Sequence, residues 1–258
     1  MTAAFANPVG LMTIVRRELL RTLKVVNQVI WPPVITTALY VLVFGLGLGS
    51  RIRTIDGVPY SAFLIPGLIM LQVISQTYDE VASSFFQGRF LNSIQEVLIA
   101  PLSSAEIVVG FVIASIIRAL GLALLMVVVG FGLAQTLPQN WGLFVLVTVI
   151  VAVIFAALGL VMGTLGEKFE HIAIPTTFII TPLVFVGGVF TSLKILPPFV
   201  QKISLFNPMV YMIDAFRYSF TGRGDVSLGL SLAVISALAA LSLAGAFALA
   251  STGYKLRI

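Results

Sequence analysis

The chain has 258 residues, of which 59% are hydrophobic and only 10% are charged, and its mean hydropathy is +1.10. Soluble domains carry about 25% charged residues, so this composition excludes a soluble domain and indicates an integral membrane protein. The net charge of +5 does not indicate nucleic-acid binding, because the basic residues lie at the ends of apolar runs, where they report topology. The absence of cysteine excludes disulfides and thiolate metal sites.

Residues 10–28 predict an amphipathic helix on the membrane surface. At 100° per residue most of its apolar side chains fall within about 120°, and Arg17, Arg21 and Lys24 lie on the opposite side. A basic amphipathic helix before a span is typical of an anchor on anionic lipid, and docking to a partner protein is the alternative. Trp31-Pro32-Pro33 is expected to mark the turn into the membrane.

The rest of the chain predicts an all-α integral membrane protein with a single transmembrane domain over residues 1–258. A crossing helix needs about 20 mainly apolar residues, and barrel strands would alternate over roughly 10 residues. Six runs meet the first description: Val29–Gly49, Tyr60–Phe86, Ile107–Gln135, Trp141–Gly166, Ile172–Thr191 and Leu228–Thr252. An even number of spans places both termini on one side, and the basic N-terminal cluster assigns that side to the cytoplasm.

Ionisable residues inside the spans are candidates for intramembrane contacts. Arg118 lies about 18 Å along the third span, near the middle of the membrane, where a charge is costly and faces protein or water. Asp79 and Glu80 sit at a comparable depth in the second span. We therefore expect an ion pair between Arg118 and one of these acids; the alternative is that both acids reach the cytoplasmic water.

Residues 193–224 are too apolar for a free loop and too rich in proline for a spanning helix. Two short helices that dip into the outer leaflet, or lie on it, fit this pattern, with Asn207 capping the second helix and Pro208 at its first position. Asp214 and Arg217 are three residues apart and can face each other. They are either a structural pair on an external cap or part of a gate.

Catalytic and cofactor motifs are weak throughout the chain. The single histidine, His171, lies in a short charged turn, which is too little for a metal or hydrolase site. The glycines of Gly45–Gly49 lack the Gly-Lys-Ser/Thr ending of a phosphate loop. We expect no catalytic residue, no metal site and no cofactor bound by this chain.

Five stretches, read in order, resemble one family of transporters. They are Val34–Gly45, Leu64–Met70, Glu96–Leu102, Pro182–Leu193 and Phe206–Tyr218. Together they resemble an ABC-2 type transporter permease, closest to the YadH-like and daunorubicin-exporter-like bacterial branch. The resemblance implies a bacterial inner-membrane protein with six spans and both termini inside. It also implies two permease copies joined to two separate ATP-binding subunits, which carry ATP and Mg, and export of a drug, lipid or glycan.

The segment 89–106, here called the coupling segment, is the amphipathic interruption between the second and third spans. The resemblance implies that it docks into the ATP-binding subunit. Val97, Leu98 and Ile99 would fill a groove on that partner, and Glu96 would fix the position of the segment in the groove through polar contacts. Pro101 would bend the chain back into the membrane. The residues expected to carry coupling are Ile94, Glu96, Val97, Leu98, Ile99, Pro101 and Leu102, with Arg17 and Arg21 on the surface helix.

Two other classes of function remain open from the residues alone. An ion-coupled secondary transporter would place buried acids at broken helices, and Asp79 and Glu80 give it slight support. A non-transporting membrane assembly protein is the other alternative. Gly159, Gly163 and Gly166 in the fourth span suit close helix packing and need no role in substrate binding.

Overall fold

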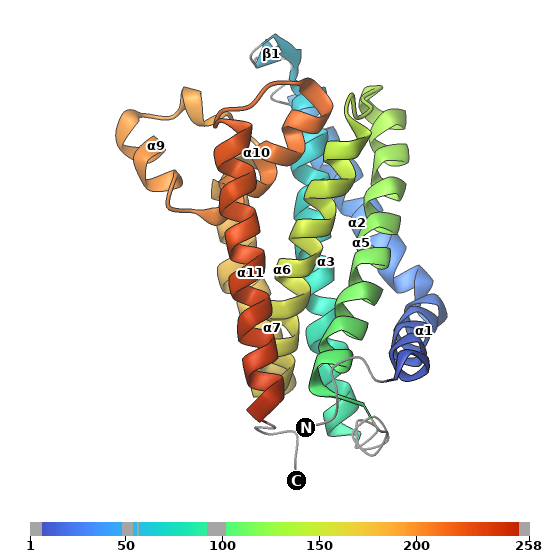
Figure 1. Cartoon of the computed structure of the whole chain (residues 1–258). Coiled ribbons are helices and arrows are strands. Elements are labelled where there is room, and N and C mark those ends of the chain that lie inside the picture. The colour runs from blue at the N-terminus through green and yellow to red at the C-terminus, as the bar shows by residue number, and fades with distance from the viewer. Residues whose placement is uncertain (1–6, 48–53, 56, 92–101, 253–258) are drawn as a thin grey trace.

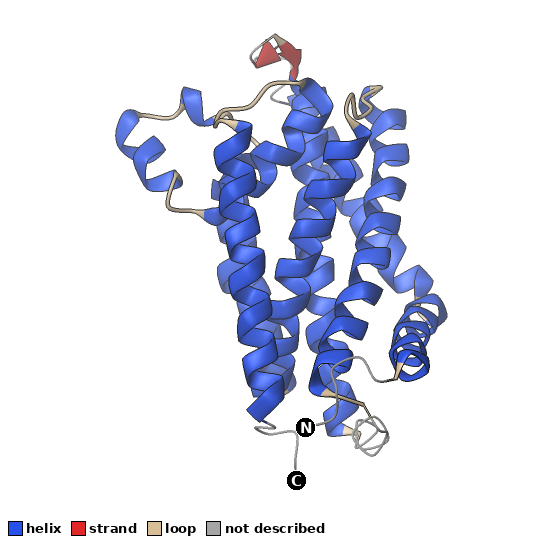
Figure 2. Ribbon diagram, in the orientation of Figure 1, coloured by secondary structure: helices blue, strands red, loops and turns tan. Residues whose placement is uncertain are grey.

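The computed structural model describes residues 7–47, 54–55, 57–91 and 102–252, and these residues form a bundle of long helices (Figures 1 and 2). Within those ranges six helical segments are long and apolar enough to cross a membrane. They are Val26–Gly45, α3 (Tyr60–Phe90), α5 (Ser104–Ala134), α6 (Trp141–Leu165), Phe169–Val189 and α11 (Leu228–Thr252). The predicted all-α architecture with six spans is confirmed.

The surface helix and the first span differ from the sequence prediction at their junction. Helix α1 (Pro8–Lys24) starts at Asn7, whose side chain accepts a hydrogen bond from the Gly10 N–H, and it ends at Val25. Helix α2 (Val26–Tyr40) follows at once and continues into the π-helix η1 (Val41–Leu46). The turn is therefore at Val25 and not at Trp31-Pro32-Pro33, which was the wrong position. Both prolines lie inside α2, because a helix in a membrane can satisfy the freed carbonyls through neighbouring groups.

Helix α3 is the centre of the bundle. In its most apolar stretch 78% of the residues are buried, against 17% for the first span and 17% for α11, which lie on the outside. Glycines let α6 approach it closely: an added Cβ would lie 2.9 Å from the Tyr78 carbonyl oxygen at Gly159 and 2.9 Å from the Ala82 carbonyl oxygen at Gly163. Gly166 has a different role, since it ends α6 as its C-cap.

The fifth span is helical but irregular. It consists of α7 (Phe169–Ile174), the π-helix η2 (Pro175–Ile180), α8 (Thr181–Val184) and the π-helix η3 (Phe185–Val189). Gly188 has φ +94° inside η3, a backbone conformation that residues other than glycine rarely adopt. At this end of the bundle lies a small hairpin, β1 (Thr54–Ile55) with β2 (Val58–Pro59).

The region before the last span contains a 3₁₀ turn, η4 (Leu193–Ile195), and two helices, α9 (Pro198–Ser204) and α10 (Pro208–Thr221). Asn207 caps α10 through the Met209 N–H at 3.0 Å, and Pro208 is its first residue, as predicted. Helix α10 dips into the bundle and packs on α3, α6 and α11, whereas α9 projects from it (Figure 1). The two short helices predicted before the last span are therefore present.

Candidate functional site

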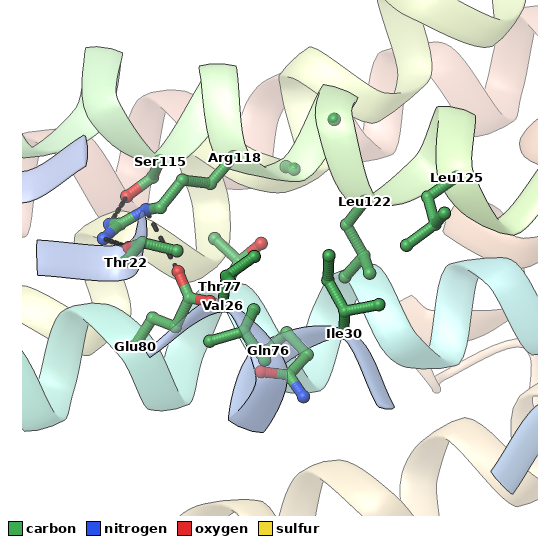
Figure 3. Close-up of a pocket in the computed structure, with 13 residues that line it drawn as sticks. Thr22, Val26, Ile30, Gln76, Thr77, Glu80, Ser115, Arg118, Leu122 and Leu125 are labelled. Atoms are coloured by element: carbon green, nitrogen blue, oxygen red, sulfur yellow. Dashed lines mark hydrogen bonds and ion pairs between the residues drawn. The ribbon is translucent and has the colours of Figure 1, made fainter. Parts of the chain in front are cut away.

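A buried charged cluster joins the surface helix to the second and third spans. It lies where α1, α3 and α5 meet (Figure 3). The Arg118 Nε lies 3.0 Å from the Glu80 Oε2, so the expected ion pair between the spans is present. Arg118 also donates to the Thr22 Oγ1 at 3.2 Å and to the Ser115 Oγ at 3.1 Å. One guanidinium therefore contacts all three helices.

Glu18 on α1 adds a second acid to this cluster. It is fully buried, its Oε2 accepts a hydrogen bond from the Ser84 Oγ at 2.7 Å, and it lies 3.7 Å from the Arg118 Nη1. Arg21 lies 3.6 Å from Glu18 and donates to the Glu80 carbonyl at 3.1 Å. Burial lowers the pKa of Arg21, and the Glu18 carboxylate partly opposes that shift. The two negative charges of the glutamates and the two positive charges of the arginines balance, and buried charges are tolerated when they are paired in this way.

Asp79 does not belong to this cluster, although the sequence placed it beside Arg118 together with Glu80. It accepts a hydrogen bond from Thr176 Oγ1 of η2 at 2.5 Å. Consecutive residues on a helix point about 100° apart, so only one of two adjacent acids can face α5. Asp79 therefore joins α3 to the fifth span, and of the two candidate acids it is Glu80 that pairs with Arg118.

The coupling segment begins at a fixed point on α6. The Arg89 Nη1 donates to three carbonyl oxygens at the end of that helix, those of Gly163 at 3.0 Å, Thr164 at 2.5 Å and Gly166 at 3.2 Å. The last carbonyls of a helix have no partner within the helix and carry its negative dipole end. A cation there satisfies them, and it locks the last turn of α3 to α6.

The segment ends at a second fixed point, on α5 and α1. Ser103 and Glu106 form a capping box at the start of α5, and the Glu106 Oε1 also accepts the Asn7 N–H at 2.7 Å. Leu102 lies against Gly10 of α1. Among the other predicted coupling residues, Arg17 is exposed and Arg21 turns into the charged cluster. The remaining ones, Ile94, Glu96, Val97, Leu98, Ile99 and Pro101, lie outside the described residues.

The opposite end of the bundle has its own polar network around α10. Asp214 accepts the Asp225 N–H at 2.7 Å and the Val226 N–H at 3.1 Å. Arg217 donates to the Gly188 carbonyl at 2.6 Å and lies 3.8 Å over the Phe63 ring. Asp214 and Arg217 are both buried but take separate partners, so the network holds the turn before α11 and the end of the fifth span against α10.

Burial shifts the pKa of both Asp214 and Arg217. It raises the pKa of Asp214, and the two backbone hydrogen bonds oppose the change. It lowers the pKa of Arg217 to about 10, so the guanidinium remains charged at neutral pH.

The sequence analysis did not predict the roles of three residues in these sites. They are Glu18 in the charged cluster, Arg89 as the donor to the end of α6, and Glu106 as the cap of α5. Ser103-x-x-Glu106 matches the capping-box signature, so a local signal for it existed. Glu18 is one acid in a basic helix, and its burial depends on which face of α1 meets α5. Within the described ranges no group of three His, Asp or Glu residues is placed to hold a metal.

The chain is similar to known membrane proteins over most of its length. The model of the family described as ABC-2 type transporter matches residues 10–221. This match runs from α1 through α10 and includes the charged cluster, Asp214 and Arg217.

The chain belongs to the ABC-2 type transporter family. It is 40% identical to the inner membrane transport permease YadH of Escherichia coli strain K12 over 227 residues, which cover 88% of this chain and 89% of that protein. It is 27% identical to Nodulation protein J of Rhizobium leguminosarum bv. viciae over 200 residues, 76% of each chain. The chain is therefore a transmembrane subunit of an ABC transporter, a multi-pass protein of the inner membrane. Membership of the family implies association with an ATP-binding subunit.

Proposed function

We propose that this chain is the permease of an ATP-driven exporter that moves a drug, lipid or glycan-like substrate out of the cytoplasm. Two copies would form the pathway, two separate ATP-binding subunits would hydrolyse ATP with Mg, and both termini would lie in the cytoplasm. The coupling segment would receive the motion of the ATP-binding subunits.

The observation that carries the proposal is the anchoring of this segment at both of its ends. At its start Arg89 donates hydrogen bonds to three carbonyls at the end of α6. At its end Glu106 caps α5 and accepts a hydrogen bond from Asn7 at the start of α1. A force applied to the segment would act on both anchors. It therefore passes to four helices, α3, α6, α5 and α1, at the same time.

The charged cluster would carry the same motion deeper into the bundle. Arg118 contacts side chains on α1 and α3 from its position on α5. Sliding α1 alone would separate the fully buried Glu18 from Arg118 and Ser84, which is costly in a low-dielectric environment. The three helices would therefore move as one body.

The docking part of the proposal is tested by placing a charge in the predicted contact. We expect the Val97→Asp and Leu98→Asp variants to lose co-purification with the ATP-binding subunit and its transport-coupled ATP hydrolysis. Lys168→Asp, in an exposed turn before α7, is the control and should retain both. Full coupled transport in the Val97 and Leu98 variants would show that the segment is not the coupling element.

The anchoring part is tested separately, in complexes that still assemble. Glu106→Ala removes both the capping acceptor and the acceptor for Asn7, whereas Glu106→Gln can form the box through its single oxygen but loses the bond to Asn7. We expect Glu106→Ala to lower transport per ATP hydrolysed several-fold and Glu106→Gln to lower it less. Equal transport in both variants would contradict transmission through this anchor.

A further inference from the structure

A cavity of about 230 Å³ lies between α2, α3 and α5, beside the charged cluster. Glu80 and Arg118 stand at one end of it, and Ile30, Leu122 and Leu125 stand at the other (Figure 3). The polar end adjoins Thr22 in the last turn of α1. Leu125 lies seven residues beyond Arg118 on α5, which is about 10 Å further into the bundle.

The cavity is therefore polar beside α1 and apolar toward Leu122 and Leu125 (Figure 3). It also faces the outside of the bundle, because only Pro33 and Thr37 of α2 are buried and Gly121, which lines the cavity, is exposed. We propose that the cavity binds a single-chain amphiphile with an uncharged, hydroxyl-bearing head, whose alkyl chain runs along Leu122 and Leu125.

The head group of the amphiphile, and not its alkyl chain, must determine which molecule the cavity binds. Lipid tails are as apolar as leucine side chains, so an alkyl chain gains little when it leaves the bilayer for this cavity. The polar end is already balanced, with Glu18 and Glu80 against Arg21 and Arg118. A charged head would add an uncompensated ion beside this balanced set, which is unfavourable in a low-dielectric site.

A hydroxyl head matches the groups that remain free at the polar end. The Arg118 Nη1 and Nη2 donate to Thr22 and Ser115, and its Nε lies 3.0 Å from the Glu80 carboxylate as an ion pair without hydrogen-bond geometry. Among contacts within the described ranges, the Thr77 hydroxyl and the second carboxylate oxygen of Glu80 have no hydrogen-bond partner, and both residues line the cavity. A hydroxyl can donate to the carboxylate and accept from the threonine. This binding does not depend on the direction or the cargo of transport.

The test compares three probes that share a ten-carbon chain: 1-decanoylglycerol, decanesulfonate and decyltrimethylammonium. Native mass spectrometry of the full-length chain, released from a neutral detergent, counts the bound probe. We expect one molecule of 1-decanoylglycerol per chain, at concentrations at least tenfold below those at which either ion binds. Equal binding of the three probes, or no binding of the neutral one, would overturn the proposal.

Two glycines of α5 provide a matched pair of variants. Gly121 lines the cavity and Gly132 does not, yet both are exposed and an added Cβ at either meets no atom within 4 Å. Gly121→Phe should abolish binding of 1-decanoylglycerol, and Gly132→Phe should leave it unchanged. Thr77→Val, which keeps the side-chain shape, should weaken it about fivefold, the loss of one hydrogen bond. Undiminished binding in Gly121→Phe would show that the probe sits elsewhere.

Discussion

Arg118 determines how the surface helix is attached to the bundle. Its side chain is 8% exposed and contacts acids on two other helices, Glu80 at 3.0 Å and Glu18 at 3.7 Å. Removing one partner of a buried pair costs more than replacing the pair as a whole, because an uncompensated charge remains. The stability of this junction therefore depends on the balance of charges more than on any single contact.

Replacing Arg118 with methionine should be strongly destabilising. Glu18 and Glu80 would then lose the cation between them, and we expect a loss of about 3–5 kcal/mol in the free energy of unfolding. Denaturant titration in detergent micelles measures it. Adding Glu80→Gln should recover part of the loss, whereas adding Asp79→Asn should recover none, because Asp79 bonds to Thr176. Equal rescue by both second changes would contradict the assignment of Glu80.

Asp214 should make the stability of the network around α10 depend on pH. Burial raises its pKa above the ordinary value of 3.8, so in the window above that value the folded state binds more protons than the unfolded state. Stability from this group is then highest below the window, and it falls as pH rises through the folded-state pKa.

The melting temperature of wild type minus that of Asp214→Asn, followed upward from pH 4, isolates this contribution. The difference should decrease as pH rises, because the other carboxyl groups, including Asp225, are common to both proteins. A difference that stays constant over the acidic range would contradict a raised pKa.

At the scale of elements, the close contact between α3 and α6 depends on small residues. In membranes helices associate by packing, since lipid tails are as apolar as leucine. Gly159→Leu would push a side chain into the Tyr78 carbonyl region, and we expect it to destabilise the protein by about 1–3 kcal/mol. Gly245→Leu on α11, where an added Cβ meets nothing within 4 Å, should be close to neutral. Thermal unfolding of the two variants in the same detergent compares them, and equal melting temperatures would rule out close packing at Gly159.

The elements themselves could largely be predicted from the sequence. Long apolar runs fix where helices cross, and Asn207-Pro208 fixes where α10 begins, because these signals are local. The turn at Val25 could not be found in this way, since the Trp-Pro-Pro motif gave a stronger but misleading signal. It is set by the docking of Ile14, Val15 and Glu18, which are buried on the face of α1 that meets the bundle.

At the scale of the whole molecule, the two polar networks lie at opposite ends of the bundle. The charged cluster and both anchors of the coupling segment are at the end that holds α1, and the Asp214 network is at the end that holds α9 (Figure 1). In the proposed orientation the first end faces the ATP-binding subunits and the second faces outward.

Cysteine labelling tests that orientation directly, because the chain contains no cysteine. Lys202 on α9 and Lys168 before α7 are both exposed and lie at opposite ends. With an impermeant maleimide on spheroplasts, Lys202→Cys should label at once and Lys168→Cys only after permeabilisation. The reverse pattern would place the termini outside.

The sequence by itself determined the membrane-spanning helices, their number and the family, because hydropathy and helix caps act over a few neighbouring residues. Only the tertiary structure decided that Glu80, and not Asp79, faces Arg118, and that Glu18 is buried with them. It also decided that Arg89 and Glu106 anchor the two ends of the coupling segment. These partners are far apart in the chain, and whether they meet depends on the rotation of each helix about its axis, which packing against its neighbours sets.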